Sequence, residues 1–177
     1  MAAQDKGLML LNGRPMFMHV LGQLEQWHPP LNRLWISANR NQDRYAKAGH
    51  AVLSDARPGF PGPLAGIETA LLASAAEWLM VVPCDMPTLP ENLPQRLIIR
   101  AKDTGLARVT SRGRVYPVLC IVHRDWLASL SEVLDNSMHG VNRWQTTCGV
   151  RDLVIDQDLH NINDELMLNA ASRWSSG

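Results

Sequence analysis

Short apolar runs alternate with longer segments of helical periodicity over most of the chain. The runs at 34–37, 51–54 and 78–82 have the length and composition of buried strands, and 78–82 is typical of a central strand covered on both faces. Helical periodicity occurs in four intervening or following segments, at 15–24, 41–48, 64–76 and 91–102. This alternation predicts a three-layer α/β domain, with a mostly parallel central sheet and helices on both faces.

The second half of the chain adds a hairpin to this pattern. Apolar segments at 106–110 and 115–122 flank Ser111-Arg112-Gly113-Arg114, a sequence typical of a tight turn between two strands. The remaining predicted elements are a strand at 150–155 and helices at 125–134 and 164–174. No repeat or linker divides the chain, so we expect one domain over residues 1–177.

The charge balance restricts the partners that such a domain can bind. Lysine plus arginine and aspartate plus glutamate each number 17, which gives a formal net charge of zero. Without a broad basic surface we expect neither a nucleic-acid nor a membrane partner. Any phosphate would have to be bound locally, by a few suitably placed groups. The cysteines form no C-x-x-C pair and the histidines have no metal-ligand spacing. We therefore expect reduced thiols and a cytoplasmic protein.

Asp85 is the first candidate for a chemical role. Ligands of open α/β sheets bind beyond the carboxyl ends of the strands, and Asp85 follows the 78–82 strand between Pro83 and Pro87. A carboxylate fixed at this edge could hold Mg²⁺, which takes one or two carboxylates together with substrate phosphates. The alternative is an aspartate that only closes a turn with its own backbone.

Three further features are candidates of the same kind. Asp55 ends the 51–54 strand, and Gly62-Pro63-Leu64-Ala65-Gly66 begins a predicted helix whose amides could face a polar ligand. Lys6 could place an ammonium group on phosphates. The alternatives are a turn aspartate, an ordinary helix start and a solvated lysine. Because the chain contains no Walker or Rossmann glycine motif, its residues alone lead to a candidate metal–phosphate site and no further.

Several segments in a fixed order resemble those of the molybdenum cofactor guanylyltransferase family. The resembling segments are Asp5-Lys6-Gly7-Leu8 with Leu11-Asn12-Gly13-Arg14-Pro15, Ser37-Ala38-Asn39-Arg40, Asp55 with Pro61-Gly62-Pro63-Leu64-Ala65-Gly66, Pro83-Cys84-Asp85-Met86-Pro87, Tyr116-Pro117 and Asn161-Ile162-Asn163. They extend over nearly the whole chain. The resemblance implies a Rossmann-like nucleotidyltransferase domain that transfers GMP from GTP to molybdenum-molybdopterin and releases pyrophosphate.

The resemblance also implies roles for individual residues. Asp85 would hold Mg²⁺ and the GTP phosphates, and Lys6 would contact those phosphates, so these two would be catalytic. Asp55 would contact the guanosine part. The nucleotide would also lie against the helix start, at Gly62, Pro63 and Gly66. Asn161 and Asn163 would help to bind the pterin partner or to position the site. Proteins that deliver or receive the cofactor would be the partners.

The chain departs from the family pattern at its beginning. The family opens with an apolar strand and L-A-G-G-x-x-x-R-M-G-G, whereas this sequence starts at Met1-Ala2-Ala3, so we expect an N-terminally incomplete domain. Ser37 stands where the family often has asparagine, and no Thr-Pro follows Asn163. Two alternatives to the guanylyltransferase remain: a truncated non-catalytic binding protein or remnant, and a related cytidylyl or sugar-phosphate nucleotidyltransferase.

Overall fold

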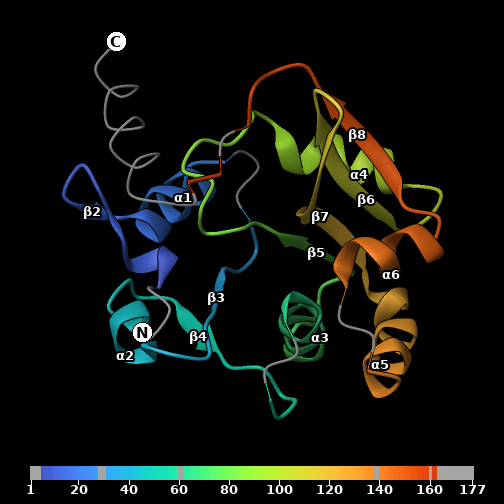
Figure 1. The fold of residues 1–177 in the computed structure, drawn as a ribbon, viewed down its shortest axis with the longest axis horizontal. Helices are drawn as coiled ribbons and strands as arrows, with labels where there is room; N and C mark the ends of the chain where they lie inside the picture. Colours follow the sequence, from blue (N-terminus) through green and yellow to red (C-terminus); the bar gives the residue numbers. More distant parts are fainter. Residues whose placement is uncertain (1–4, 28–30, 60–61, 138–139, 160, 163–177) are drawn as a thin grey trace. The chain divides into compact units, whose positions relative to one another are not determined.

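The computed structural model describes residues 5–27, 31–59, 62–137, 140–159 and 161–162 (Figure 1). The chain is divided into two compact units. One contains Met1–Leu31, Val82–Leu93 and Gln157–Gly177, and the other contains Asn32–Val81 and Pro94–Asp156. Below they are called the terminal unit and the central unit. The expectation of a single domain over residues 1–177 stays a prediction.

The main sheet of the central unit has four strands in the order β5-β7-β6-β8. Their bounds are Trp78–Val81 for β5, Leu106–Ser111 for β6, Arg114–His123 for β7 and Arg151–Ile155 for β8. The predicted hairpin forms with Arg112 and Gly113 in its turn, at φ of 46° and 76°. Positive φ at both turn residues matches the twist of the two strands that the turn joins.

The predicted α/β fold is present, but its four-stranded sheet is mixed in strand direction rather than mostly parallel. β7 runs antiparallel to both β5 and β6, and only the β6–β8 pair is parallel. The physical reason is the hairpin, which places two successive strands in the middle of the sheet and so reverses the chain there. In this order β5 stands at one end and its residues are all partly buried, so it is not the covered central strand expected from 78–82.

A second, parallel pair lies in the same unit and follows the predicted alternation. β3 (Trp35–Ser37) pairs with β4 (Ala51–Leu53), and α2 (Gln42–Ala46) lies between them in sequence. The register places Ser37 opposite Leu53, and Ala38 N donates to Leu53 O at 2.9 Å. The chain therefore leaves both strands at the same edge of this pair.

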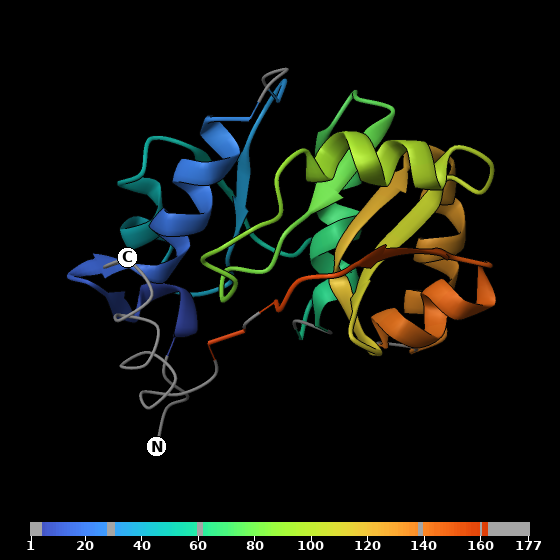
Figure 2. The ribbon, with the colours of Figure 1, turned by 90° about the horizontal axis from the view of Figure 1, so that it is seen from above.

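Helices cover both faces of the four-stranded sheet, as predicted. α3 (Pro63–Ala73), α5 (Leu127–Asp135) and α6 (Val141–Thr147) share one hydrophobic core with the sheet, through residues that include Leu71, Leu130 and Trp144. Figure 2 shows α4 (Leu93–Ala101) on the opposite face. Strand residues alternate between the faces, so Cys120 and Val122 of β7 enter the shared core while Ile121, between them, belongs to the other face of the sheet.

The terminal unit contains a short hairpin and one longer helix. The 3-10 helix η1 (Lys6–Leu8) precedes β1 (Leu10–Leu11) and β2 (Arg14–Pro15), which are joined through Asn12 and Gly13 at positive φ. The predicted helix follows as α1 (Met16–Glu25), which buries the apolar face expected of it. Met9, Leu11, Met16 and Ile162 form a small core, which brings the last described residues of the chain to this hairpin.

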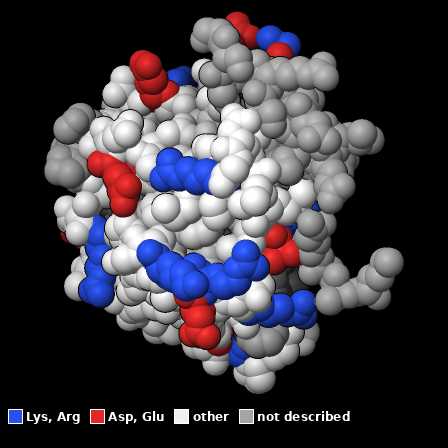
Figure 3. All heavy atoms as spheres, turned by 90° about the vertical axis from the view of Figure 1, so that its left-hand side faces the viewer, with Lys and Arg blue, Asp and Glu red and all other residues white. Residues whose placement is uncertain are grey.

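The surface carries both signs of charge. On the face shown in Figure 3, lysine and arginine side chains alternate with acidic ones. Within the described ranges, no helix has the length and apolar character that crossing a membrane requires. The predicted helix at 164–174 lies outside the described residues.

Candidate functional site

The central unit gathers four residues beyond the ends of β3 and β4. Ser37 ends β3, Asp55 follows β4 by two residues, and Asn39 and Gly66 complete the group, which we call the Asp55 cluster. Two parallel neighbouring strands present the residues after their carboxyl ends at one edge. The structure therefore confirms that Ser37 and Asp55 lie at the ends of the strands predicted at 34–37 and 51–54.

Asn39 holds Asp55 through two hydrogen bonds. Its Nδ2 donates to Asp55 Oδ2 at 2.8 Å, and the Asp55 backbone N donates to its Oδ1 at 2.8 Å. Ser54 Oγ donates to the same Oδ1 at 3.2 Å. One amide side chain thus fixes both the backbone and the carboxylate of Asp55. Sequence reasoning gave Asn39 no role, although it lies within the segment that resembles the family.

Gly66 lets α3 come close to this cluster. A Cβ at Gly66 would lie 2.9 Å from Ser37 Oγ and 3.5 Å from Asp55 Oδ1. The helix begins at Pro63 after Gly62, whose φ of 91° is in the region that favours glycine. The first turn of α3 therefore presents its backbone beside Asp55 with little side-chain bulk, an arrangement suited to a polar or anionic ligand. Of the predicted residues, Gly66 lies beside Asp55, and Gly62 and Pro63 precede it at the start of the same helix.

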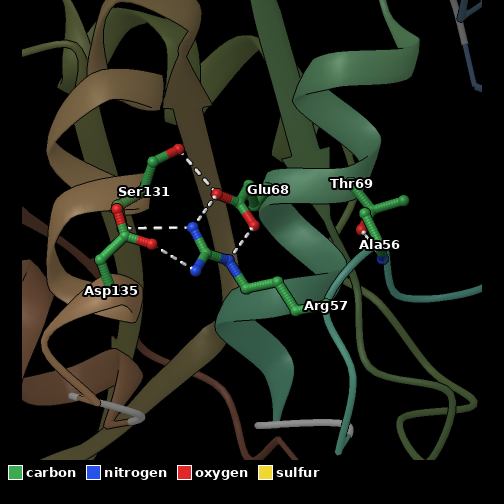
Figure 4. A network of polar contacts seen from close by, with 6 residues as sticks. All are labelled: Ala56, Arg57, Glu68, Thr69, Ser131 and Asp135. Atoms are coloured by element: carbon green, nitrogen blue, oxygen red, sulfur yellow. Dashed lines mark hydrogen bonds and ion pairs between the residues drawn. The ribbon is translucent and has the colours of Figure 1, made fainter.

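An ion-pair network adjoins the Asp55 cluster (Figure 4). Arg57 Nε lies 2.6 Å from Glu68 Oε2 and Arg57 Nη2 lies 2.8 Å from Glu68 Oε1, so the pair is bidentate. Arg57 Nη1 also contacts Asp135 Oδ1 at 2.6 Å, and Ser131 Oγ donates to Glu68 Oε1 at 2.6 Å. The sequence did not reveal this network, because the residues that pair in it are 11 to 78 positions apart along the chain.

Asp85 belongs to the terminal unit, in the segment that follows β5. Its backbone O accepts a hydrogen bond from Ile162 N at 2.8 Å. Because Asn161 directly precedes Ile162, two of the predicted site residues, Asp85 and Asn161, lie on touching segments. Asn163 lies outside the described residues.

Lys6, Asp5 and Asp85 all lie close enough to Cys84 for their charges to act on its thiol. Loss of hydration, followed by the carboxylates of Asp85 and Asp5, raises the pKa of the Cys84 thiol to about 11, while Lys6 acts in the opposite direction. Three charged groups therefore act on one sulfur, and we call Asp5, Lys6, Cys84 and Asp85 the Asp85 cluster. At neutral pH the thiol stays protonated and is a poor nucleophile.

Gln23 of α1 fixes the backbone just beyond Asp85. Leu89 N donates to Gln23 Oε1 at 2.8 Å, and Gln23 Nε2 donates to Pro87 O. The second proline of the Asp85 motif is thereby tied to a helix. Among the described residues, no group of three or more His, Cys, Asp or Glu side chains could by itself hold a metal ion.

The fold has solved counterparts. The chain aligns with molybdopterin-guanine dinucleotide biosynthesis protein A from Archaeoglobus fulgidus at a TM-score of 0.78 and 15% identity, covering 98% of this chain and 92% of that one. It also aligns with 2-C-methyl-D-erythritol 4-phosphate cytidylyltransferase from Thermus thermophilus at a TM-score of 0.73 and 13% identity, covering 96% and 93%. These likenesses show a nucleotidyltransferase fold.

The sequence comparisons are more specific. The profile of the MobA-like NTP transferase domain matches residues 1–149. A molybdenum cofactor guanylyltransferase from Shewanella loihica is 39% identical over 146 residues, which are 81% of this chain and 73% of the relative. The chain belongs to the MobA-like nucleotidyltransferases and, within them, to the molybdenum cofactor guanylyltransferase family.

Proposed function

We propose that the protein transfers GMP from GTP to molybdenum-molybdopterin and so forms the molybdopterin guanine dinucleotide cofactor. The bond between the α-phosphorus of GTP and the oxygen bridging to the β-phosphate breaks. A new bond joins the α-phosphorus to an oxygen of the terminal phosphate of molybdopterin, and pyrophosphate leaves. The identity of 39% to a guanylyltransferase over 81% of the chain carries this proposal.

In this proposal the Asp55 cluster binds the guanosine part of GTP. Asp55 Oδ2 accepts the hydrogen bond from Asn39, and Asp55 Oδ1 faces Gly66, which has no side chain. A carboxylate oriented in this way can accept hydrogen bonds from the N–H groups of guanine or the hydroxyls of ribose. The backbone of Gly62 and Pro63 begins the helix beside it, where amides favour a polar ligand.

The Asp85 cluster acts on the phosphates in the same proposal. Asp85 would hold Mg²⁺, which typically takes one or two carboxylates together with substrate phosphates and water. The bound metal would supply charge neutralisation at the phosphate oxygens. Lys6, whose charge acts on neighbouring Cys84, would add an ammonium group for the phosphates. Asn161, on the segment that touches Asp85, binds the pterin substrate or positions the site, and Asn163 shares this role.

The partners in this proposal are small molecules and the proteins that deliver or receive the cofactor. Nucleic acid and membranes are not among them, because lysine plus arginine only equals aspartate plus glutamate. Cys84, Cys120 and Cys148 are free thiols, which suits the reducing cytoplasm where we place the reaction.

The test is a reconstituted reaction. The purified chain is incubated with GTP, Mg²⁺ and molybdenum-molybdopterin, and dinucleotide formation and pyrophosphate release are followed together. We expect both products in equal amounts. GTP binding without either product would identify a non-catalytic binding protein, and a product formed from CTP instead would identify a cytidylyltransferase.

A further inference from the structure

Three consecutive residues after β4 are each anchored by a different side chain of the central unit. Asp55 N donates to Asn39 Oδ1 at 2.8 Å, and Ala56 N donates to Thr69 Oγ1 at 2.9 Å. The third, Arg57, is held by Glu68. Thr69 and Glu68 are neighbours in α3, so the loop that carries Asp55 is attached to this helix at two successive points.

The Arg57–Glu68 contact is the more directional of these attachments. Both Glu68 oxygens receive hydrogen bonds from the guanidinium group, at 2.6 and 2.8 Å, and Ser131 of α5 donates to one of them. Glu68 is only 3% exposed, so little water competes for these bonds. A planar fork on a planar carboxylate fixes angle as well as distance. The pair therefore sets the orientation of the loop relative to α3.

The same helix carries the Gly66 backbone that faces Asp55. Gly66 precedes Glu68 by two positions, and a Cβ there would meet Ser37 Oγ and Asp55 Oδ1. A shift of the loop along α3 would thus change the space between Asp55 and the helix start. Asp135 of α5 also contacts Arg57, but the Asp135 side chain is 68% exposed. This contact therefore fixes Arg57 less firmly than the contact with Glu68 does.

We propose that the Arg57–Glu68 pair is a positioning element for guanine nucleotide binding. It holds the loop after β4 against α3 so that Asp55 and the helix start at Gly62–Gly66 contact one nucleoside together. This inference rests on the proposed function, in which Asp55 binds the guanosine part. Neither Arg57 nor Glu68 touches the ligand in this account; both act through Asp55.

The experiment measures GTP affinity by calorimetry, with KM, kcat and Tm, in matched variants. Glu68→Gln keeps the shape of the side chain but removes its charge, and Arg57→Lys keeps the charge but removes the fork. Asp152→Asn is the control, because Asp152 pairs with the buried Arg108 at 2.7 Å in the same unit without contact to the loop after β4. Asp55→Asn, alone and combined with Glu68→Gln, tests the link to Asp55.

We expect Glu68→Gln and Arg57→Lys to raise the Kd and KM for GTP about tenfold, with a smaller change in kcat, because misplaced binding groups cost affinity and alignment. Asp152→Asn should lower Tm but leave the Kd unchanged. The double variant should lose less than the sum of the single losses, since both act at one place. Wild-type affinity in folded Glu68→Gln, while Asp55→Asn binds weakly, would overturn the inference alone. Wild-type affinity in Asp55→Asn would overturn the assigned role of Asp55 and the inference with it.

Ser131→Ala provides a milder variant if Glu68→Gln does not fold. It removes the 2.6 Å hydrogen bond to Glu68 Oε1 and leaves the ion pair in place. We expect a smaller rise in the Kd for GTP, in the same direction. An unchanged Kd in Ser131→Ala and Arg57→Lys would show that the network serves stability only, and the inference would be wrong.

Discussion

Asn39 bonds Asp55 at two separate points, its backbone N and its carboxylate Oδ2, each at 2.8 Å. Asp55 follows a strand of three residues, so its own strand gives it little support. The amide compensates because it fixes the carboxylate from the neighbouring strand's end. Asn39 therefore positions Asp55 in the candidate nucleoside site.

The first prediction concerns this pairing. Asn39→Asp replaces the donor at Nδ2 by an oxygen and places two carboxylates in contact. Like charges in contact repel, so Asp55 turns away or takes up a proton, and the affinity for GTP falls by about tenfold or more. Titration calorimetry at neutral pH measures the loss. The same substitution at exposed Asn92, before α4, is the control and should bind GTP as the wild type does.

The second prediction concerns Asp85. Asp85→Asn keeps the size of the side chain but loses the charge proposed to hold Mg²⁺. Because metal-ion stabilisation of a transition state supplies several kcal/mol, turnover should fall at least ~10²-fold while Tm stays near that of the wild type. Dinucleotide formation and thermal melting are measured together, with Asp103→Asn at an exposed loop as control. Near-normal turnover in Asp85→Asn would remove Asp85 from the catalytic site.

Much of the fold follows from the alternation of apolar runs with helical segments. The runs at 34–37, 51–54 and 78–82 all contain strands, and the hairpin around Arg112-Gly113 forms as predicted. The direction of the sheet did not follow, because periodicity shows that a strand exists but not which neighbour it pairs with. The helix α6 was also missed: its sequence, Val-Asn-Arg-Trp-Gln-Thr-Thr, has only Val141 and Trp144 as apolar anchors.

The candidate site was predictable only where backbone position decides it. Ser37 and Asp55 could be placed because strand ends collect ligand-binding residues. The roles of Asn39 and Glu68 could not be predicted. A helical glutamate is usually solvated, whereas Glu68 is 3% exposed and accepts hydrogen bonds from Arg57 and from Ser131 of α5. Side-chain networks depend on tertiary contacts that spacing along the chain does not show.

The third prediction concerns base selection. The residue segments around Asp55 and Gly66 resemble those of guanylyltransferases, and a carboxylate can accept hydrogen bonds from guanine that cytosine does not offer in the same place. A site built on such bonds discriminates strongly against a ligand that lacks them. In a competition assay with equal concentrations, GTP should be consumed and CTP left. Comparable use of both nucleotides would favour a different nucleotidyltransferase.

The fourth prediction separates stability from binding at Gly66. Alanine is favoured over glycine within a helix by ~1 kcal/mol, and Ser37 Oγ, which its Cβ would meet at 2.9 Å, can rotate away. Gly66→Ala should therefore leave Tm unchanged or slightly higher. The new methyl group would also face Asp55 Oδ1, so the Kd for GTP should rise several-fold. Melting curves and calorimetry on one preparation decide it, and a large fall in Tm would contradict the argument.

The last prediction is a pH dependence of stability that arises at Glu68. The Arg57 guanidinium holds the pKa of the Glu68 carboxyl below its usual value, with help from Ser131 and against the effect of burial. A carboxyl group whose pKa is lower in the folded than in the unfolded chain stabilises the fold above the unfolded pKa of ~4.3, and this contribution is lost as the pH falls toward the folded pKa. The free energy of unfolding should therefore differ most between wild type and Glu68→Gln near neutral pH. The difference should shrink below about pH 4, as Glu68 takes up a proton and comes to resemble glutamine.

Urea unfolding across this pH range measures the difference. Asp135→Asn is the control, since the exposed carboxylate of Asp135 should contribute little at any pH. A difference between wild type and Glu68→Gln that stays constant from neutral to acidic pH would show that the charge of Glu68 does not stabilise the fold.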